Sequence, residues 1–312
     1  MRVAISGSHG LVGSALAPFL TAGGHEAARL VRQPASVGTD ISWDPDNGRL
    51  DPVRLEGFDA VVHLAGESIA AGRWTPAKKA RILESRVAGT RLLSETLAAL
   101  KAPPRVLVTA SAMGWYGDRG DEPLPEEASS GSLFLSEVVR QWEAATEAAR
   151  RRGIRVVPLR FGVILSAAGG ALAKMLPPFK LGLGGPIGSG RQWMSWITLD
   201  DVLGVILHAI RSDTLAGPVN AVTPRPVTNT EFTRILARVL HRPAFFPMPA
   251  FAARMAFGQM ADELLLASAK VVPAKLEATG YRFLYPDLEP ALRHLLGRAE
   301  AGPGREVTPS GR

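Results

Sequence analysis

Cysteine is absent from the 312 residues of the sequence. Its absence excludes disulfide bonds, thiolate nucleophiles and thiolate metal ligands, and it is typical of a reducing compartment such as the cytoplasm. The six histidines lie far apart along the chain, and no two of them have metal-ligand spacing. We therefore expect a cytoplasmic protein without a metal site.

Long hydrophobic runs are also missing, although 46% of the residues are hydrophobic. No stretch approaches the roughly 18 consecutive apolar residues that a membrane span needs. The apolar run after Arg2 is too short for a signal peptide. The sequence therefore predicts neither a membrane partner nor export.

The excess of positive charge does not gather in one stretch. The formal net charge is +7, but basic residues are interleaved with acidic ones, as in KKARILESRVAGTR. This pattern indicates a solvated, arginine-rich surface, and we expect no nucleic-acid partner. Part of the charge can help to attract an anionic cofactor.

Short apolar runs typical of buried strands alternate with helical patterns over the first 165 residues. This alternation predicts an α/β fold, a Rossmann-type doubly wound parallel sheet with a smaller C-terminal α/β lobe. We expect a nucleotide-binding domain over 1–165, a second lobe over 166–298 and a disordered tail over 299–312. The expected strands are Val3–Ser6, Ala28–Val31, Ala60–Leu64, Val106–Thr109, Val156–Leu159 and, later, Val219–Val222.

Helical periodicity and stop signals predict the main helices. Pro76 suits a first turn, and Pro103 with Pro104 forbids continuation of the helix that precedes them. The predicted helices are Leu11–Leu20, Pro76–Leu100, Leu133–Arg152, Asp200–Ile210, Thr230–Leu240 and Phe251–Ala269. Asp200 or Asp201 is expected to cap the fourth of these.

Three glycines interrupt the opening MRVAISGSHGLVGSALAPFL between the first strand and the first helix. Gly7 permits a tight turn, Gly10 lets a phosphate approach the backbone, and Gly13 allows close packing of helix on strand. Amides at the start of a helix attract anions, so the junction predicts a pyrophosphate site. The alternative is an ordinary glycine-rich turn without a ligand. The expected site comprises Gly7, Ser8, His9, Gly10, Leu11, Val12 and Gly13.

The end of the second strand distinguishes the two nicotinamide dinucleotides. An acid there accepts the 2′-hydroxyl of NAD, whereas an arginine favours the 2′-phosphate of NADP. The stretch ARLVRQP carries Arg32 and no acid. We therefore predict NADP(H), the alternative being that Arg32 is one more surface arginine.

The chain resembles the extended short-chain dehydrogenase/reductase superfamily in SGSHGLVGSAL, HLAG, GTRLL and VTASAMGWYGD. Within it, the chain is most similar to the NADP-binding epimerase family proteins, which include cell-division inhibitor homologues. This narrower resemblance rests on LGLGGPIGSGRQWMSWITLDDV, VNAVTP and KVVPAKLEATGY, the last in a C-terminal domain of unknown function. The resemblance implies a Rossmann fold and further cofactor contacts at Leu64, Ala65, Gly66, Arg86 and Thr109.

Members of the superfamily usually combine a Ser or Thr with a Tyr and a Lys four residues later, whose charge lowers the tyrosine pKa. Here the corresponding stretch SLFLSEVVRQWEAAT contains neither tyrosine nor lysine. Ser111 and Tyr116 are the candidate catalytic residues that remain near the fifth parallel strand. The alternative is that both are structural.

The glycine-rich block GGPIGSGRQWMSWI begins the second lobe and could close over a ligand. Arg191, Gln192 and Trp193 are the candidate substrate-binding residues. Alternatively, Trp193 and Trp196 fill the core between the lobes.

Two functions follow from these features. The first is an NADP(H)-dependent oxidoreductase or epimerase-like enzyme acting on a small carbonyl, hydroxyl or sugar-like substrate. The second is a non-catalytic NADP(H)-binding regulatory protein linked to a partner such as the division machinery. The resemblance also allows a homodimer paired through the long helices.

Overall fold

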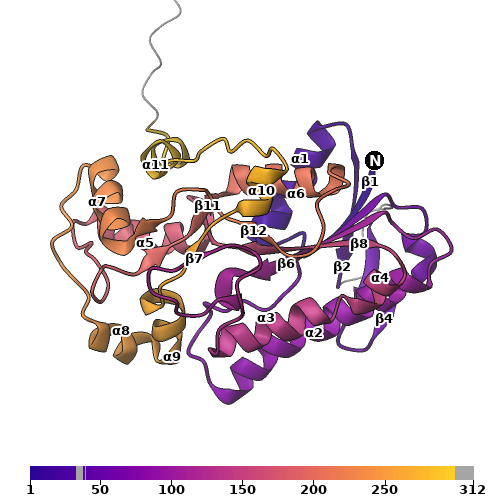
Figure 1. Ribbon diagram of the computed structural model, residues 1–312, viewed down its shortest axis with the longest axis horizontal. Coiled ribbons are helices and arrows are strands. Elements are labelled where there is room, and N and C mark those ends of the chain that lie inside the picture. The colour runs from indigo at the N-terminus through magenta and orange to yellow at the C-terminus, as the bar shows by residue number, and fades with distance from the viewer. Residues whose placement is uncertain (33–37, 39, 299–312) are drawn as a thin grey trace, which may run out of the picture.

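The computed structural model describes residues 1–32, 38 and 40–298, so the tail prediction for 299–312 lies outside the described residues. Its centre is an eight-stranded sheet (Figure 1). In spatial order the strands are β12 (Val219–Ala221), β8 (Arg155–Phe161), β6 (Val106–Ala112), β5 (Ala60–His63), β1 (Arg2–Ser6), β2 (Glu26–Val31), β3 (Ile41–Asp44) and β4 (Arg49–Leu50). All neighbours are parallel except β3 and β4.

Helices cover both faces of this sheet, because successive side chains of a strand point to opposite sides. On one face Val3 and Ile5 of β1 pack with α1 (Leu11–Ala22) and α6 (Leu199–Arg211). On the other face Ala4 packs in the cluster that contains α2 (Pro76–Ala99) and α4 (Glu147–Arg151). Figure 1 shows these two helical layers on either side of the strands. The Rossmann-type prediction is confirmed.

The strand order reverses at β1. The chain runs outward from β1 to β2 and β3, then returns to β5 on the other side of β1 and continues to β6 and β8. In such sheets the crevice at the carboxyl ends of the two strands flanking the reversal is the usual ligand site. A ligand site is therefore expected beside Ser6 and His63, the last residues of β1 and β5.

The prediction of one continuous helix over Leu133–Arg152 is wrong. It divides into α3 (Phe134–Ala144) and α4, with Ala145 and Thr146 between them. The Thr146 hydroxyl donates to the carbonyl of Glu143, and the flanking backbone tightens into shorter turns. A side chain that bonds its own preceding turn competes with the regular ladder, which explains the break.

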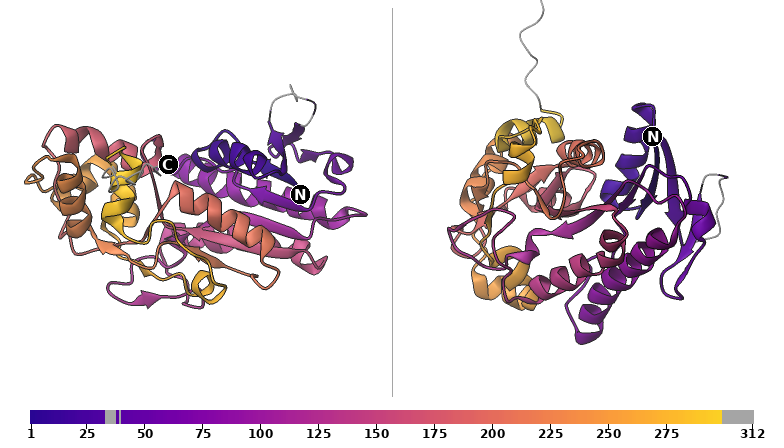
Figure 2. Two further views of the ribbon diagram at one scale, coloured as in Figure 1. Left: turned by 90° about the horizontal axis from the view of Figure 1, so that it is seen from above. Right: turned by 45° about the vertical axis from the view of Figure 1, so that its right-hand side comes forward.

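The second lobe has its own core, at the end of the molecule away from β1 (Figures 1 and 2). It is formed by α5 (Gly170–Lys180), α7 (Asn229–Leu240) and α11 (Leu288–Leu295), with Trp196 fully buried among them. Three short ladders add to it: β9 (Val163–Ser166) with β11 (Trp196–Thr198), β10 (Trp193–Met194) with β13 (Val227–Thr228), and β7 (Pro123–Leu124) with β14 (Lys270–Val271).

The helix predicted over Phe251–Ala269 is also interrupted. It begins as α8 (Ala250–Phe257), which ends at Gly258 with a φ of +62°. The short α9 (Gln259–Ala261) and one π-helical turn over Asp262–Leu266 follow. Only glycine adopts that backbone readily, so Gly258 sets the interruption. The remaining elements are 3₁₀ turns at Pro52–Leu55 and Met113–Trp115, and α10 (Ala274–Ala278).

The start of α6 anchors the C-terminal part of the chain. Its cap is Thr198 rather than the predicted Asp200 or Asp201, because the Thr198 hydroxyl oxygen accepts from the Asp201 amide. The buried Asp201 carboxylate instead accepts from the amides of Leu284 and Tyr285 and from the Tyr281 hydroxyl. Burial raises the pKa of Tyr281 well above its usual range, so this hydroxyl stays a donor.

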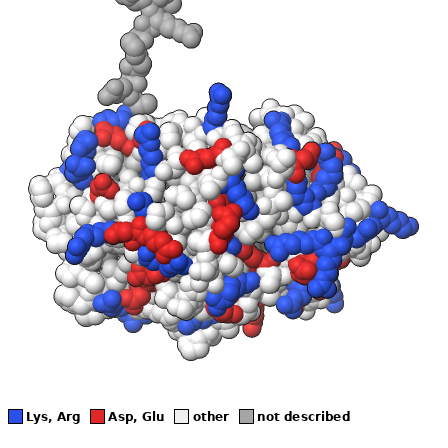
Figure 3. Space-filling model, in the orientation of Figure 1, with Lys and Arg blue, Asp and Glu red and all other residues white. Residues whose placement is uncertain are grey.

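Within the described part of the chain, none of the helices combines the length and apolar character needed to cross a bilayer. Figure 3 shows basic and acidic groups interspersed over the visible face, as the sequence pattern indicated.

We expect Asp201→Ala to lower the free energy of unfolding by about 2–4 kcal/mol, since it removes several hydrogen bonds and leaves buried donors unpaired. Urea titration followed by circular dichroism measures the change. Asp200→Ala is the control, because the Asp200 side chain is 42% exposed and, among the described residues, pairs with His294 alone, so its loss should cost less than about 1 kcal/mol. Equal effects of the two substitutions would contradict the anchoring role of Asp201.

Candidate functional site

The glycine turn between β1 and α1 has no room for side chains at two of its three glycines. Gly7 has a φ of +70°, and a Cβ there would lie 2.6 Å from the carbonyl carbon of Leu64. A Cβ on Gly13 would lie 2.3 Å from the Gly7 oxygen. The turn thus packs against β5 on one side and its own helix on the other, which matches the roles predicted for Gly7 and Gly13.

The first turn of α1 has free backbone donors. Gly10 is the N-cap, has no side chain to accept from the turn, and donates its own amide to the Gly7 oxygen. No acidic residue lies in the first turn. The amides of Leu11 and Val12 and the positive end of the helix dipole are therefore available to an anion. Ser8 is buried and His9 is exposed beside this turn. The geometry fits the phosphates of a dinucleotide.

A buried chain of polar groups holds the turn from below. The Ser6 hydroxyl lies 2.6 Å from His63 Nδ1, and the other ring nitrogen lies 3.0 Å from the Thr90 hydroxyl. The indole of Trp142 also donates to Thr90, and the Leu64 amide donates to Ser6. Complete burial lowers the pKa of His63 to about 4, so the ring is neutral near pH 7.

The predicted ribose end of the site carries positive charge. Arg32 follows β2 and is exposed, whereas Arg29 is held by two hydrogen bonds to Asp40. Residues 33–37 and 39 lie outside the described chain. A hydrogen bond from Lys78 and the charges of Lys78, Arg81 and Arg32 lower the pKa of Glu67, which follows Gly66. Positive charge therefore predominates around this carboxylate.

Arg86 lies against the other side of the crevice. Its guanidinium carbon would lie 3.4 Å from a Cβ on Gly66, it packs over the Trp142 ring, and it donates to the Ile82 carbonyl. Burial lowers its pKa to about 10. It forms no ion pair with any residue in the described ranges. A desolvated cation without a carboxylate partner is suited to an anionic ligand.

Ser111 lies at the carboxyl end of β6, after Thr109, but its hydroxyl is already engaged. It donates to Glu143 of α3 over 2.6 Å. Arg160 of β8 clamps the same carboxylate with two hydrogen bonds of 2.8 and 2.9 Å. Because the paired carboxylate is an acceptor only, Ser111 offers a lone pair rather than a proton to any ligand.

Tyr116 belongs to the same buried network. Its hydroxyl donates to Asn220 over 2.6 Å and accepts from Arg160 over 3.1 Å. The side chain is fully buried, and burial raises the pKa of its phenol. In this arrangement Tyr116 holds Arg160 and Asn220 together. The structure brings Ser111 and Tyr116 into one network, through Glu143 and Arg160, but not into direct contact.

The face of α3 that would carry the usual tyrosine and lysine is apolar. Leu135, Val138 and Val139 are buried, and Phe134 packs edge-on against Trp74. The amides of Phe134 and Leu135 donate to the carboxylate of Glu263, which lies in the π-helical turn of the second lobe. The second lobe is thereby fastened to the first turn of α3.

The three residues predicted to bind substrate differ in their burial and in their contacts. The Gln192 amide is buried and donates to the carbonyls of Ile187 and Leu265. The Trp193 indole donates to Asp121, and Lys270 lies over its ring. Arg191 is exposed. These contacts hold the glycine-rich block to the second lobe and, through Asp121, to the segment before β7, and substrate binding by the three residues stays a prediction.

Sequence reasoning missed His63, Glu143, Arg160 and Glu263. One signal was present for Arg160, which is a charged residue at the end of the apolar strand stretch VVPLRF. No local pattern could pair it with Glu143, because the two lie on different elements and meet only in the folded chain.

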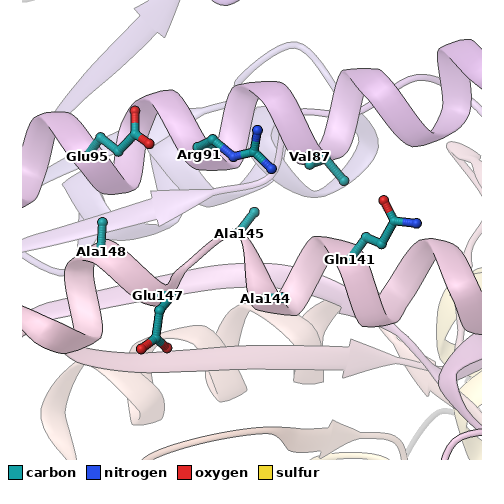
Figure 4. A pocket seen from close by; sticks show the side chains of 8 residues that line it. All are labelled: Val87, Arg91, Glu95, Gln141, Ala144, Ala145, Glu147 and Ala148. Carbon is teal, nitrogen blue, oxygen red and sulfur yellow. The ribbon is translucent and has the colours of Figure 1, made fainter.

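A separate cavity of about 250 Å³ lies between α2 and the α3–α4 pair (Figure 4). It is lined by short apolar, charged and amide side chains and includes none of the predicted site residues. Its lining residues are Val87, Arg91, Glu95, Gln141, Ala144, Ala145, Glu147 and Ala148.

Comparisons with known proteins agree with this geometry. The family described as "NAD dependent epimerase/dehydratase family" matches residues 3–221, and "Domain of unknown function (DUF1731)" matches 248–295. Epimerase family protein MT2273 of Mycobacterium tuberculosis is 43% identical over 302 residues, covering 97% of this chain and 98% of the relative. The crystal structure of human epimerase family protein SDR39U1 (isoform 2) with NADPH is 35% identical, with a TM-score of 0.88 over 96% of this chain and 100% of that one.

The neutral His63 makes stability depend on pH. Its pKa in the folded chain, about 4, lies below the usual value near 6.5, so its contribution is complete above about pH 6.5 and is lost as the pH falls toward 4. We expect this group to lower the free energy of unfolding by about 2 kcal/mol between pH 8 and pH 5. Urea titrations at both pH values measure it.

His63→Gln should reduce that pH dependence by the same amount. His241→Asn is the control, because His241 is exposed and its replacement should leave the pH dependence unchanged. An unchanged profile in His63→Gln would exclude a neutral, buried histidine.

Proposed function

Because the chain belongs to the NAD dependent epimerase/dehydratase family, we propose that it binds NADP(H) in the crevice between β1 and β5. We further propose that it transfers hydride between the nicotinamide and a small carbonyl, hydroxyl or sugar-like substrate, without the usual tyrosine and lysine pair. The nicotinamide supplies the hydride, and the residues around Ser111 handle the substrate oxygen.

One observation carries the binding proposal, the close packing at Gly7 and Gly13 below the uncapped start of α1. It leaves the backbone bare where a pyrophosphate must approach and presents free amides to it. Arg32 supplies a cation at the ribose end, which favours the 2′-phosphate of NADP. The similar human protein was crystallised with NADPH, which supports the same cofactor here.

For the chemistry, Ser111 is the catalytic residue we propose. A substrate hydroxyl donates to the Ser111 oxygen, and Ser111 in turn donates to Glu143. A proton leaving the substrate can therefore move through Ser111 toward the Glu143 carboxylate while Arg160 keeps that carboxylate in place. Tyr116, buried and bound to Asn220, acts as a positioning residue for Arg160.

The second candidate is a non-catalytic NADP(H)-binding regulatory protein. The observation that favours it is that Leu135 and Val139 are apolar and buried. They lie in the stretch where members of the superfamily usually carry the catalytic tyrosine and lysine. Binding and turnover must therefore be tested separately.

We expect Gly13→Ala to weaken NADPH binding at least about tenfold, because the added carbon must displace the Gly7 carbonyl and with it the amides that face the phosphates. Isothermal titration calorimetry measures the change. Gly23→Ala, at the opposite end of α1, is the control, since its nearest neighbour would lie at an ordinary 3.4 Å. Full NADPH affinity in Gly13→Ala would refute the binding site.

For turnover, NADP⁺ reduction is followed with a panel of alcohols and nucleotide sugars, because the Ser111 oxygen accepts from a substrate hydroxyl. Ser111→Ala should lower kcat by about 100-fold or more, since removal of a proton-transfer group has this scale, while NADPH affinity is kept. Tyr116→Phe should change kcat less than about tenfold and lower thermal stability, because it leaves Asn220 unsatisfied. Ser42→Ala, on the exposed side of β3, is the control. Cofactor binding without reduction of NADP⁺ by any compound would favour the regulatory function.

A further inference from the structure

Exposed large apolar side chains gather in two segments of the second lobe. Leu181 is 74% exposed, Phe245 82% and Met255 71%. Together with Leu183, Phe246 and Phe251 they make up what we call the phenylalanine patch. Elsewhere in the described chain, large exposed apolar residues occur singly, as at Val53 and Leu284. A contiguous apolar surface of this kind marks an interaction site.

The two segments are fixed side by side by their backbones. The Phe246 amide donates to the Gly184 carbonyl over 3.1 Å, and the Met248 amide donates to Pro186 over 2.9 Å. A Cβ on Gly185 would lie 1.9 Å from the Phe246 oxygen. With the backbones in contact, the side chains of both segments are left at the surface.

Helix α8 continues the same surface. Phe251 and Met255 lie one turn apart on one face of the helix, while Ala253 faces the interior. Before the helix, every residue from 241 to 249 except Ala244 is exposed. The core of the lobe is closed beneath by Phe179 and Leu240, so folding does not require the exposed side chains.

The exposed charges beside Leu181 and Phe245 are basic, whereas at α8 the pair Arg254–Asp262 adds one charge of each sign. The sequence contains no Asp or Glu between Glu147 and Asp200, and none between Glu231 and Asp262. Lys180 and Arg242 lie together, because Arg242 Nε donates to the Lys180 carbonyl over 3.0 Å. Both are exposed, and neither has an acidic partner within the described ranges. Figure 3 shows mostly uncharged surface at the outer end of this lobe.

We propose that the phenylalanine patch docks on the surface of an anionic lipid bilayer. Exposed Phe, Leu and Met side chains enter the boundary between headgroups and acyl chains, while Lys180 and Arg242 meet the lipid phosphates. The charges of Lys180 and Arg242, unpaired among the described residues, select an anionic surface rather than a neutral one. This docking is peripheral, and it departs from the expectation that the chain has no membrane partner.

Vesicle flotation tests the proposal with the full chain. Wild type should bind vesicles of equal phosphatidylglycerol and phosphatidylcholine, and bind phosphatidylcholine alone about tenfold more weakly or worse. Phe245→Ser/Phe246→Ser should weaken binding to the anionic vesicles by about tenfold or more, since two large apolar side chains no longer enter the interface. Lys180→Gln/Arg242→Gln should weaken binding and flatten its salt dependence.

Val53→Ser/Leu284→Ser is the matched control, because it removes two exposed apolar side chains outside the patch. It should bind like wild type, and melting temperatures should be equal in all variants. Equal binding to neutral and anionic vesicles, or equal weakening by the control pair, would overturn the proposal. So would a homodimer that the Phe245→Ser/Phe246→Ser variant dissociates while vesicle binding stays unchanged.

Discussion

The contact between the Gly7 backbone and the first turn of α1 is the constraint on which the site depends. A Cβ on Gly13 would lie 2.3 Å from the Gly7 oxygen, so helix and strand meet as closely as two backbones can. That approach brings the uncapped amides of α1 over the ends of β1 and β5. The neutral His63 below keeps Ser6 and Thr90 in register with the turn. The proposed anion site is therefore built from the backbone and is supported by one buried chain of polar groups.

A second buried network connects the sheet with α3 around Ser111 and Tyr116. Glu143 comes from α3, Arg160 from β8 and Asn220 from β12, and their hydrogen bonds converge around Ser111 and Tyr116. A buried ion pair adds little net stability, but removal of one partner is destabilising because it leaves the other charge buried and unpaired. The network thus fixes which polar atoms Ser111 can offer. This geometry distinguishes Ser111 from Tyr116, a distinction the sequence left open.

The sequence predicted the elements whose patterns are local. The glycine turn, α2 and the parallel strands of the large sheet other than β3 follow from periodicity, proline placement and glycine spacing. The break at Thr146 and the π-helical turn did not, because they depend on side-chain competition and on the backbone at Gly258. Glu143 and Arg160 could not be paired either, since contacts across elements leave no trace in one sequence. The local geometry of the glycine turn was therefore predictable from the sequence, whereas the network around Ser111 was not, and phosphate binding by the turn stays a prediction.

The carboxylate of Glu263 accepts the first two amides of α3, and this single contact bears on how the chain can be divided. The matched C-terminal region that contains it, residues 248–295, completes the end of a helix belonging to the nucleotide-binding layer. The C-terminal region therefore contributes contacts that the rest of the fold uses, and it is not a separable module. In an N-terminal fragment without this region, the amides of Phe134 and Leu135 at the start of α3 would lose their acceptor. Chimaeras between relatives should therefore keep both regions from the same protein.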